Sequence, residues 1–504
     1  MEESGNTTIN YSGKLIAKNT VYNLLGYGVP LVFALAIIPF LVKGLGNEKF
    51  GILNLVWVVI GYFSFFDFGI GRALTKIVAE KIGTNQTNEI PSLFWTSLLL
   101  MLLISLIGTI ILLFLIPSLV HNIFNISKGL QAETLKTFYI LALSIPIVTT
   151  TAGIRGILEA YQMFGIINII RTFLGMFMFL GPLLCLIFTN SLFWIVIILI
   201  IIRIIVWVLF FVQCFKLDIK IENKIYFKKN LVKPILKLSG WLTISNIIVP
   251  LIVYMDRFMI GALVSAAAIA YYATPYEAVT KLLLIPGALI GVLFPAFSAS
   301  FLTNPNFTKK LSLKAVKYSF IFLYPVVLLI ITFAHEGMSL WLGKNFAENS
   351  SLILQLLAAG VLFNGLAYIP FTYLQGIGRA DITAKVNLIE LPFYFFAMWF
   401  AIKYIGINGA ALVWLLRMMI DALILFLFAQ KTMSGHFQFK FELNYLYVII
   451  LIITSIFPFL INNLGLKLIL TSIILLTFIF ISWRFLLLEE EKMFLISRIR
   501  IFNS

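Results

Sequence analysis

Nine charged side chains within the long apolar stretches of this sequence are the first candidates for chemistry. They are Arg171, Arg203, Asp256, Arg257, Glu277, Lys281, Glu390, Arg417 and Asp421. A charge at the centre of a bilayer costs on the order of 3 kcal/mol or more, so such residues are treated first as functional. An arginine fork matches phosphate and pyrophosphate, and carboxylates can bind a proton or a cation. The residue types predict recognition of an anionic group, with the acids as candidates for ion coupling.

Four of these charges also have a structural interpretation as ion pairs. Glu277 and Lys281 are four residues apart, so they can neutralise each other on one helix face. Arg417 and Asp421 have the same spacing and the same option. For both pairs the structural and the functional interpretation stay open.

The other five charges have no partner at helical spacing. Asp256 and Arg257 are adjacent and point apart on a helix, so each needs another partner. Arg257 can extend to the outer surface, and Arg171 and Glu390 lie near the predicted cytoplasmic ends of their helices. Arg203 lies near the middle of its apolar run, with no acid on the same helix. It is therefore the strongest candidate for contacting phosphate.

Signatures of catalysis and metal binding are absent from the sequence. It has no glycine-rich loop ending in Gly-Lys-Ser/Thr and no Gly-x-Ser-x-Gly motif. His121, His335 and His436 lack the spacing of metal ligands. Cys185 and Cys214 both fall in apolar runs, so we expect buried free thiols. We predict no enzyme, no bound metal and no cofactor.

These charges must be positioned by helices that cross a membrane. The chain is 61% hydrophobic and 12% charged, with a mean hydropathy of +1.04, which excludes a soluble fold. A run of about twenty apolar residues spans a bilayer as an α-helix. We predict an all-α polytopic membrane protein with about 14 transmembrane helices, at residues 20–43, 50–70, 91–117, 134–157, 163–188, 191–215, 238–263, 268–299, 312–333, 350–376, 383–402, 408–430, 445–463 and 465–487.

The distribution of basic residues predicts the topology. Residues 216–237 form the longest polar stretch and carry seven lysines, so they are predicted to be a cytoplasmic hinge loop. With the N-terminus (1–19) and the tail (488–504) also cytoplasmic, only seven of the 37 Lys and Arg residues fall outside: Lys43, Lys49, Lys128, Lys136, Lys344, Lys403 and Lys467. This asymmetry accounts for the net charge of +16, so no nucleic-acid partner is expected.

An internal repeat divides the predicted spans. Residues 43–53 resemble 260–271, and residues 158–165 resemble 374–381, both at an offset of about 217 residues. The offset predicts two six-helix lobes as a parallel repeat, at 20–215 and 238–430, plus two extra spans at 445–487. Between spans two and three, residues 67–83 have the pattern of an amphipathic helix, whose start Asp67 could cap.

Residues 39–80 contain short motifs that resemble those of a known protein family. They contain Gly44-Leu45-Gly46, Phe50-Gly51-Ile52 and Asp67-Phe68-Gly69, followed by a basic amphipathic stretch. Together with residues 254–279, this pattern resembles the polysaccharide and O-antigen flippases of the multidrug/oligosaccharidyl-lipid/polysaccharide exporter superfamily. The resemblance covers roughly residues 15–430.

The resemblance implies a transporter of the bacterial cytoplasmic (inner) membrane. It would move undecaprenyl-pyrophosphate-linked oligosaccharide units between leaflets by alternating access of two lobes, for O-antigen, capsule or exopolysaccharide assembly. Its partners would be that lipid-linked oligosaccharide, membrane lipids, a glycan polymerase and other assembly proteins. Coupling to protons, sodium or the membrane potential is implied, and the sequence does not choose among them. Whether the two extra spans at 445–487 form a groove for the lipid stays open.

We assign roles to residues on this basis. Substrate binding is assigned to Arg203, Arg257, Lys281, Arg417 and Arg171, ion coupling to Asp256, Glu277, Asp421 and Glu390, and a conformational role to Asp67 and Gly69. Two other functions stay open. A MATE-type drug or cation antiporter would favour acidic residues in its cavity. A membrane polymerase or ligase of lipid-linked glycans usually has one large external loop, whereas the predicted external loops here are short.

Overall fold

The protein is helical throughout the part of the chain that the structure describes. The computed structural model describes residues 13–63, 67–84, 86–161, 163–217, 227–287, 293, 297, 305–434, 461, 463–487, 489 and 491–493. All regular structure in these residues is helical, which confirms the predicted all-α class. The chain forms two compact units, Met1–Ala273 and Thr274–Ser504.

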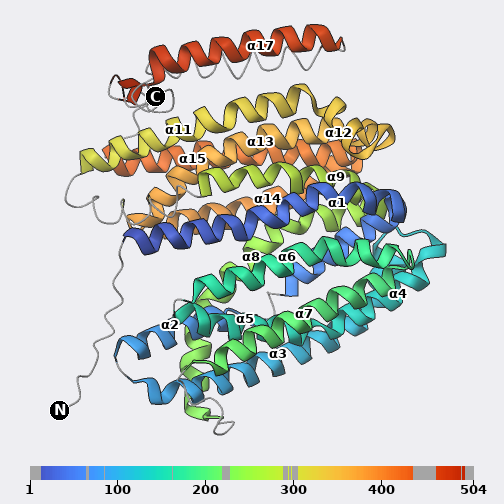
Figure 1. The fold of residues 1–504 in the computed structure, drawn as a ribbon, viewed down its shortest axis with the longest axis vertical. Helices are drawn as coiled ribbons and strands as arrows, with labels where there is room; N and C mark the ends of the chain where they lie inside the picture. The colour runs from blue at the N-terminus through green and yellow to red at the C-terminus, as the bar shows by residue number, and fades with distance from the viewer. Residues whose placement is uncertain are drawn as a thin grey trace, which may run out of the picture. The chain divides into compact units, whose positions relative to one another are not determined.

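The first unit is a helical bundle (Figure 1). Its elements are α1 (Gly13–Tyr62), α2 (Ile70–Gly83), η2 (Thr87–Glu89), α3 (Ile90–Ser118), η3 (Leu119–Ile123), α4 (Lys128–Leu143), α5 (Ile145–Ala160), α6 (Phe164–Leu186), α7 (Leu192–Phe215), α8 (Lys229–Leu263) and the first part of α9 (Ala266–Thr280). Apolar side chains of α2, α3, α5, α6 and α7 share one buried cluster. Because lipid is as apolar as these side chains, close packing holds such helices together more than exclusion from water does.

Helix α1 contains two predicted spans joined by a kink instead of a loop. The sequence separates 20–43 from 50–70, but the helical stretch is interrupted only at Gly46, with φ 73° and ψ 164°. A positive φ is readily available to glycine, which lacks a Cβ atom. Figure 1 shows α1 in dark blue and the chain turning back beyond its first half. Gly46 therefore makes an elbow, and the second half of the helix ends at Tyr62.

Glycines bring several helices of the first unit into close contact. A Cβ atom on Gly156 of α5 would lie 2.9 Å from the carbonyl oxygen of Gly71 on α2. A Cβ on Gly175 of α6 would overlap the ring of Pro30 on α1, since it would lie 2.8 Å from the Pro30 Cβ. Small residues at helix interfaces let backbones approach, as is common in membrane proteins.

The second unit is arranged around one long central helix. Its elements are the end of α9, η5 (Lys281–Leu283), α11 (Pro305–Thr332), α12 (Ala334–Leu342), α13 (Lys344–Gly376), α14 (Ala380–Ile405), α15 (Ile407–Ser434), α17 (Leu464–Ile481) and η7 (Ser482–Leu486). Helix α13 packs against α11, α12, α14 and α15. At Gly360 a Cβ atom would meet the ring of Trp414, so α13 and α15 lie close together there.

Helix α17, the last predicted span, packs against α11. The rings of Phe478 and Tyr324 lie 4.8 Å apart between their centroids. At its start, Lys467 Nζ lies 2.8 Å from Glu336 Oε1 of α12. Burial alone would raise the pKa of Glu336, but the hydrogen bond and charge of Lys467 hold that pKa below its ordinary value. An aromatic contact and an ion pair thus attach α17 to the second unit.

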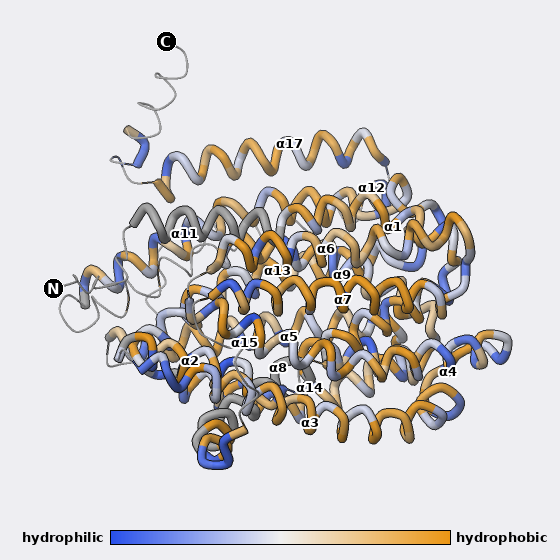
Figure 2. Tube along the Cα trace, turned by 60° about the horizontal axis from the view of Figure 1, so that its bottom comes forward, coloured by the Kyte–Doolittle hydropathy of each residue, from blue (hydrophilic) through white to orange (hydrophobic). Residues whose placement is uncertain are grey.

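Ten helices among the described residues are long and apolar enough to cross a membrane. Figure 2 shows apolar residues along most of α3, α7 and α17, with hydrophilic residues toward helix ends. The number is smaller than 14 partly because the kinked α1 counts once and because 445–460 and most of 288–304 lie outside the described residues. The count of 14 stays a prediction, as does the extra pair of spans at 445–487.

The predicted lobes and the two compact units have different boundaries. The lobe predicted at 238–430 begins with α8, whereas α8 and the start of α9 pack within the first unit. These helices belong to the first unit because the corner between them is hydrogen-bonded to the loop that follows η3. There the Asn125 N–H donates to Gly261 O at 2.9 Å. Residues 1–12, 218–226 of the predicted hinge loop and 494–504 of the tail lie outside the described residues.

Candidate functional site

The Arg203 side chain lies on the side of α7 that packs into the first unit. The side chains exposed on this helix are on the other side and include Ile201, Ile205, Val208 and Val212. Arg203 Nη2 lies 3.6 Å from the Met178 sulfur on α6, while its buried Nε has no hydrogen-bond partner. No acidic side chain within the described ranges pairs with it. A guanidinium carries five N–H donors, so Arg203 retains donors for an anionic ligand.

The α7 face beside Arg203 is fixed by aromatic packing. One turn further on, Trp207 Nε1 donates to Thr150 Oγ1 of α5 at 3.0 Å. The Trp207 ring also stacks on Phe211, with centroids 4.9 Å apart and an interplanar angle of 11°. The sequence interpretation missed this support, although Arg203, Trp207 and Phe211 share a spacing of four residues. Helices α5, α6 and α7 together therefore position the arginine.

Asp256 and Arg257 of α8 are held in a buried polar network. They are 0% and 1% exposed. Asp256 Oδ2 accepts from Tyr272 OH at 2.8 Å, and Asp256 Oδ1 accepts from the Arg257 N–H at 2.7 Å. The Arg257 guanidinium lies 5.3 Å from the ring centroid of Tyr254. The expected extension of Arg257 to the outer surface is wrong, because its side chain is enclosed by protein.

Two other assigned cations, Lys281 and Arg171, are less enclosed. Lys281 Nζ lies 3.3 Å from Glu277 Oε2, and both side chains are over 40% exposed. The pair predicted from the spacing therefore forms in the second unit. Arg171 is half-buried on α6 and belongs to the first unit, as Arg203 does.

Glu390, Arg417 and Asp421 form a charged cluster in the second unit. Arg417 Nε on α15 lies 3.3 Å from Glu390 Oε2 on α14, and the side chains are only 13% and 11% exposed. The Arg417 guanidinium also lies 4.9 Å from the Tyr394 ring centroid. The structural interpretation of Arg417 holds in part: its hydrogen-bonded ion pair is with Glu390 on the neighbouring helix, while Asp421 lies close enough to interact with its charge. The expectation that Glu390 reaches water is wrong, because its side chain is only 11% exposed. The other oxygen, Glu390 Oε1, is buried without a hydrogen-bond partner.

Asp67 and Gly69 shape the turn that leads into α2. Gly69 is the N-cap residue, with φ 72°, and Phe68 before it has φ 46°. Asp67 Oδ1 accepts from the Gly69 N–H at 2.7 Å. The carboxylate does not cap the first turn of α2 as suggested from the sequence; it fixes the left-handed turn that precedes the helix.

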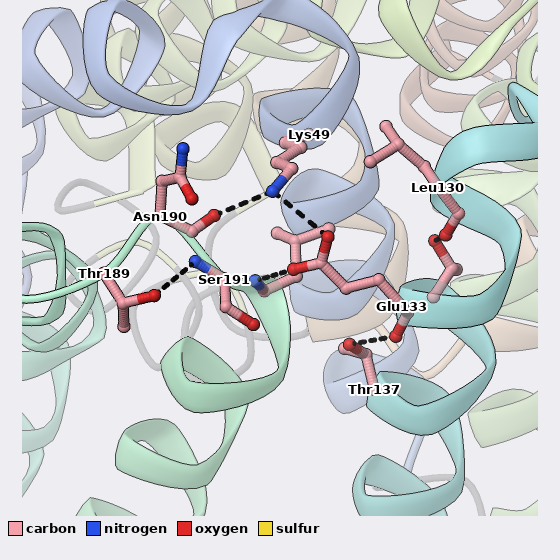
Figure 3. A network of polar contacts seen from close by, with 9 residues as sticks. Lys49, Leu130, Glu133, Thr137, Thr189, Asn190 and Ser191 are labelled. Carbon is pink, nitrogen blue, oxygen red and sulfur yellow. Dashed lines mark hydrogen bonds and ion pairs between the residues drawn. The ribbon is translucent and has the colours of Figure 1, made fainter.

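An ion-pair network that the sequence interpretation missed joins α1, α4 and the start of α7 in the first unit (Figure 3). Lys49 Nζ lies 3.1 Å from Glu133 Oε2 and donates to Asn190 O at 3.0 Å. Glu133 Oε1 accepts from the Leu192 N–H at 2.6 Å. The predicted topology puts all of these segments on the outer side of the membrane. That shared side was the one feature of the sequence analysis that indicated the three segments could meet.

Comparisons with known proteins decide the family. Residues 16–301 match the model of the family described as "Polysaccharide biosynthesis protein". A Shigella flexneri protein named "Putative O-antigen transporter" is 32% identical over 415 residues, which cover 81% of this chain and 96% of the relative. The chain belongs to the polysaccharide biosynthesis protein family. The resemblance predicted from 39–80 and 254–279 is thereby confirmed.

Solved structures show the same fold. One is the inward-facing conformation of a multidrug resistance MATE family transporter of the MOP superfamily, with a TM-score of 0.67, 16% identity, and coverage of 83% of this chain and 95% of that one. Another is a MOP superfamily transporter from Pyrococcus furiosus, for which a binding pocket of reverse polarity suggests a different function; its TM-score is 0.60 at 16% identity, covering 84% and 96%. This family member therefore has the fold of the MOP superfamily transporters.

Proposed function

We propose that this protein is a flippase for polysaccharide assembly, not an enzyme. The observation that carries the proposal is its similarity to the Shigella relative over nearly the whole of that protein. The substrate would be an oligosaccharide unit on undecaprenyl pyrophosphate, carried to the outer leaflet of the bacterial cytoplasmic membrane by alternating access. A glycan polymerase would then use the unit.

In this proposal Arg203 binds the pyrophosphate of the lipid carrier. Its guanidinium lies on the side of α7 that packs into the first unit and has no acidic partner in the described part of the chain. Its Nε has no hydrogen-bond partner. Phosphate oxygens match the guanidinium fork and would supply the missing acceptors. Arg257 is less suited to this role because its side chain is buried, with the guanidinium against the Tyr254 ring.

Export of organic cations is the second candidate, since MATE transporters share the fold. A cation substrate would need carboxylates that are free to face it. Asp256 instead accepts from Tyr272, and Glu277 pairs with Lys281. These contacts favour an anionic substrate over a cationic one.

The charged cluster of the second unit is the proposed site of ion coupling. Glu390 and Asp421 supply two negative charges against the single positive charge of Arg417. An uncompensated charge buried in a membrane protein is costly, so binding of a proton or a sodium ion would balance the cluster. Its release in one of the transport states would couple the ion gradient to substrate movement.

A reconstituted flipping assay tests the proposal. Purified protein in liposomes that hold pyrophosphate-linked oligosaccharide should raise the rate at which the lipid becomes accessible from the opposite leaflet. Arg203→Ala should slow this rate by roughly tenfold to a hundredfold, because hydrogen bonds to charged groups contribute about 1.5–3 kcal/mol. Lys136→Ala, which removes an exposed cation of the same unit, is the control and should leave the rate unchanged. Equal rates with and without protein would refute the proposal.

A further inference from the structure

Two segments related by the internal repeat pack against each other within the first unit. The first is the elbow of α1 in 43–53, bent at Gly46. The second is the corner in 260–271, where α8 ends at Leu263 and α9 begins at Ala266. Each is a helix–bend–helix element at the corresponding position of its repeat. We define the two elements together as the paired elbows.

The paired elbows meet through small residues. A Cβ atom placed on Gly51 would overlap the carbonyl oxygen of Ala266, so the two backbones touch at this point. Beside this contact, Asn47 Nδ2 donates to Tyr271 OH at 2.7 Å. The Phe50-Gly51-Ile52 motif of the family resemblance therefore has a physical reason: only glycine permits this approach.

The loop after η3 straps the second elbow in place. Asn125 N–H donates to Gly261 O at 2.9 Å, and Ala266 N–H donates to Asn125 O at 3.2 Å. Asn125 Nδ2 also donates to Val264 O at 3.3 Å. Asn125 thus donates two hydrogen bonds and accepts a third, and together they tie the loop of the first repeat to the corner of the second.

The bonds within one repeat differ in kind from those between repeats. Within the first repeat, the Lys49–Glu133 ion pair joins α1 to α4, and the bond from Ser127 N–H to Glu48 Oε1 joins the loop to α1. The contacts described above between the elbows are neutral hydrogen bonds and the touching backbones at Gly51. Neutral hydrogen bonds contribute little net free energy each, so they can be exchanged for bonds to water when the elbows part.

We propose that the paired elbows and the Asn125 strap form a reversible latch that closes one end of the transport path. The latch lies at the end where Lys43, Lys49 and Lys128 lie, which the positive-inside rule places outside the cell. The inference rests on the proposed transport function and adds its gate. Release of the substrate to the outside would require the elbows to separate, with Gly51 and Ala266 moving apart while the Lys49–Glu133 ion pair of the first repeat stays intact.

Reversible crosslinking tests the latch. In a background with Cys185 and Cys214 replaced by alanine, Asn47→Cys and Tyr271→Cys are joined by a short bifunctional methanethiosulfonate reagent. Crosslinking should abolish flipping in the liposome assay, and reduction should restore it. Crosslinked protein that flips lipid at the uncrosslinked rate would overturn the proposal.

A matched pair controls for the chemistry. His121 Nδ1 and Gln131 Oε1 lie 2.9 Å apart, exposed and within the first repeat at the same end. Crosslinking His121→Cys with Gln131→Cys should leave flipping unchanged, since it joins no two repeats. If crosslinking this control pair also abolished flipping, the loss would be an effect of the reagent, and the latch proposal would be overturned.

A labelling experiment needs no substrate and therefore separates failure of the latch from failure of the proposed function. Asn54 is 5% exposed, lies one turn beyond Phe50 and donates to the Phe50 carbonyl oxygen at 2.9 Å. If the elbows part as proposed, a cysteine in its place (Asn54→Cys) becomes more accessible. Tyr271→Phe, which removes the acceptor of the Asn47 bond, should raise labelling of this cysteine by an impermeant thiol reagent severalfold in intact cells. An unchanged labelling rate would overturn the latch, whatever the flipping assay shows.

Discussion

Removal of Arg417 should destabilise the second unit far more than removal of its partner Glu390. Arg417→Leu removes the cation of the cluster and leaves Glu390 and Asp421 together. Glu390→Gln leaves Arg417 with Asp421 one turn away on the same helix, and the new amide oxygen can still accept a hydrogen bond. The two variants break the same 3.3 Å contact, yet their residual charges differ.

The expected free energies follow from burial. Breaking a buried ion pair by removing one partner costs about 3–5 kcal/mol, because the other charge stays behind uncompensated. The side chains here are 13% and 11% exposed, so this range applies, and the single contact of Arg417 with Glu390 favours its lower end. We expect a loss of about 3 kcal/mol for Arg417→Leu. For Glu390→Gln we expect about 1 kcal/mol or less, the size of one exchanged hydrogen bond.

Unfolding of the purified protein in mixed micelles measures this difference, with helix content followed by circular dichroism as denaturing detergent is added. The double variant Arg417→Leu/Asp421→Asn should recover part of the loss, since it removes one of the two stranded carboxylates. Equal destabilisation by Arg417→Leu and Glu390→Gln, or no recovery in the double variant, would refute the reasoning.

Three further outcomes are expected. Gly51→Ala should lower the free energy of unfolding by about 1–3 kcal/mol through overpacking against Ala266, whereas Gly28→Ala, with no heavy atom within 4 Å of the added Cβ, should not; thermal melts in detergent measure both. Lys467 lowers the pKa of Glu336, so their pair stabilises the fold above the unfolded pKa of about 4.3 and this contribution is lost as pH falls through the lower folded pKa. Glu336→Gln should remove that part of the pH dependence in the same melts. In the flipping assay, Arg203→Lys should retain more activity than Arg203→Ala but less than the wild type, since a lysine keeps the charge and loses the fork.

Much of the fold follows from composition and the positions of apolar runs, because only helices with satisfied backbone bonds fit such segments in a membrane. The connections are harder to predict. The sequence separates 20–43 from 50–70, but it does not show that Gly46 joins them as an elbow instead of a loop. The boundary of the first unit could not be predicted either, because the bonds of Asn125 to the α8–α9 corner are formed between residues far apart in sequence.

The site was predictable as a set of residues and less so as a set of contacts. Spacing alone correctly predicts the Glu277–Lys281 pair, because both partners lie on one helical stretch. Spacing fails for Arg417, which can reach either Asp421 or Glu390; the packing of α14 against α15 decides for Glu390. Likewise Tyr272, the partner of Asp256, lies beyond a chain reversal that no single-helix pattern describes.

The most direct measurement is the leaflet location of lipid-linked oligosaccharides in cells with and without this gene. The proposed function predicts that cells lacking it hold complete units stranded on the cytoplasmic leaflet, and that the wild-type gene, but not Arg203→Ala, restores them to the outer leaflet. Units that accumulate outside in the absence of the gene would contradict flipping and point to a polymerase or ligase. An unchanged distribution would contradict the account altogether.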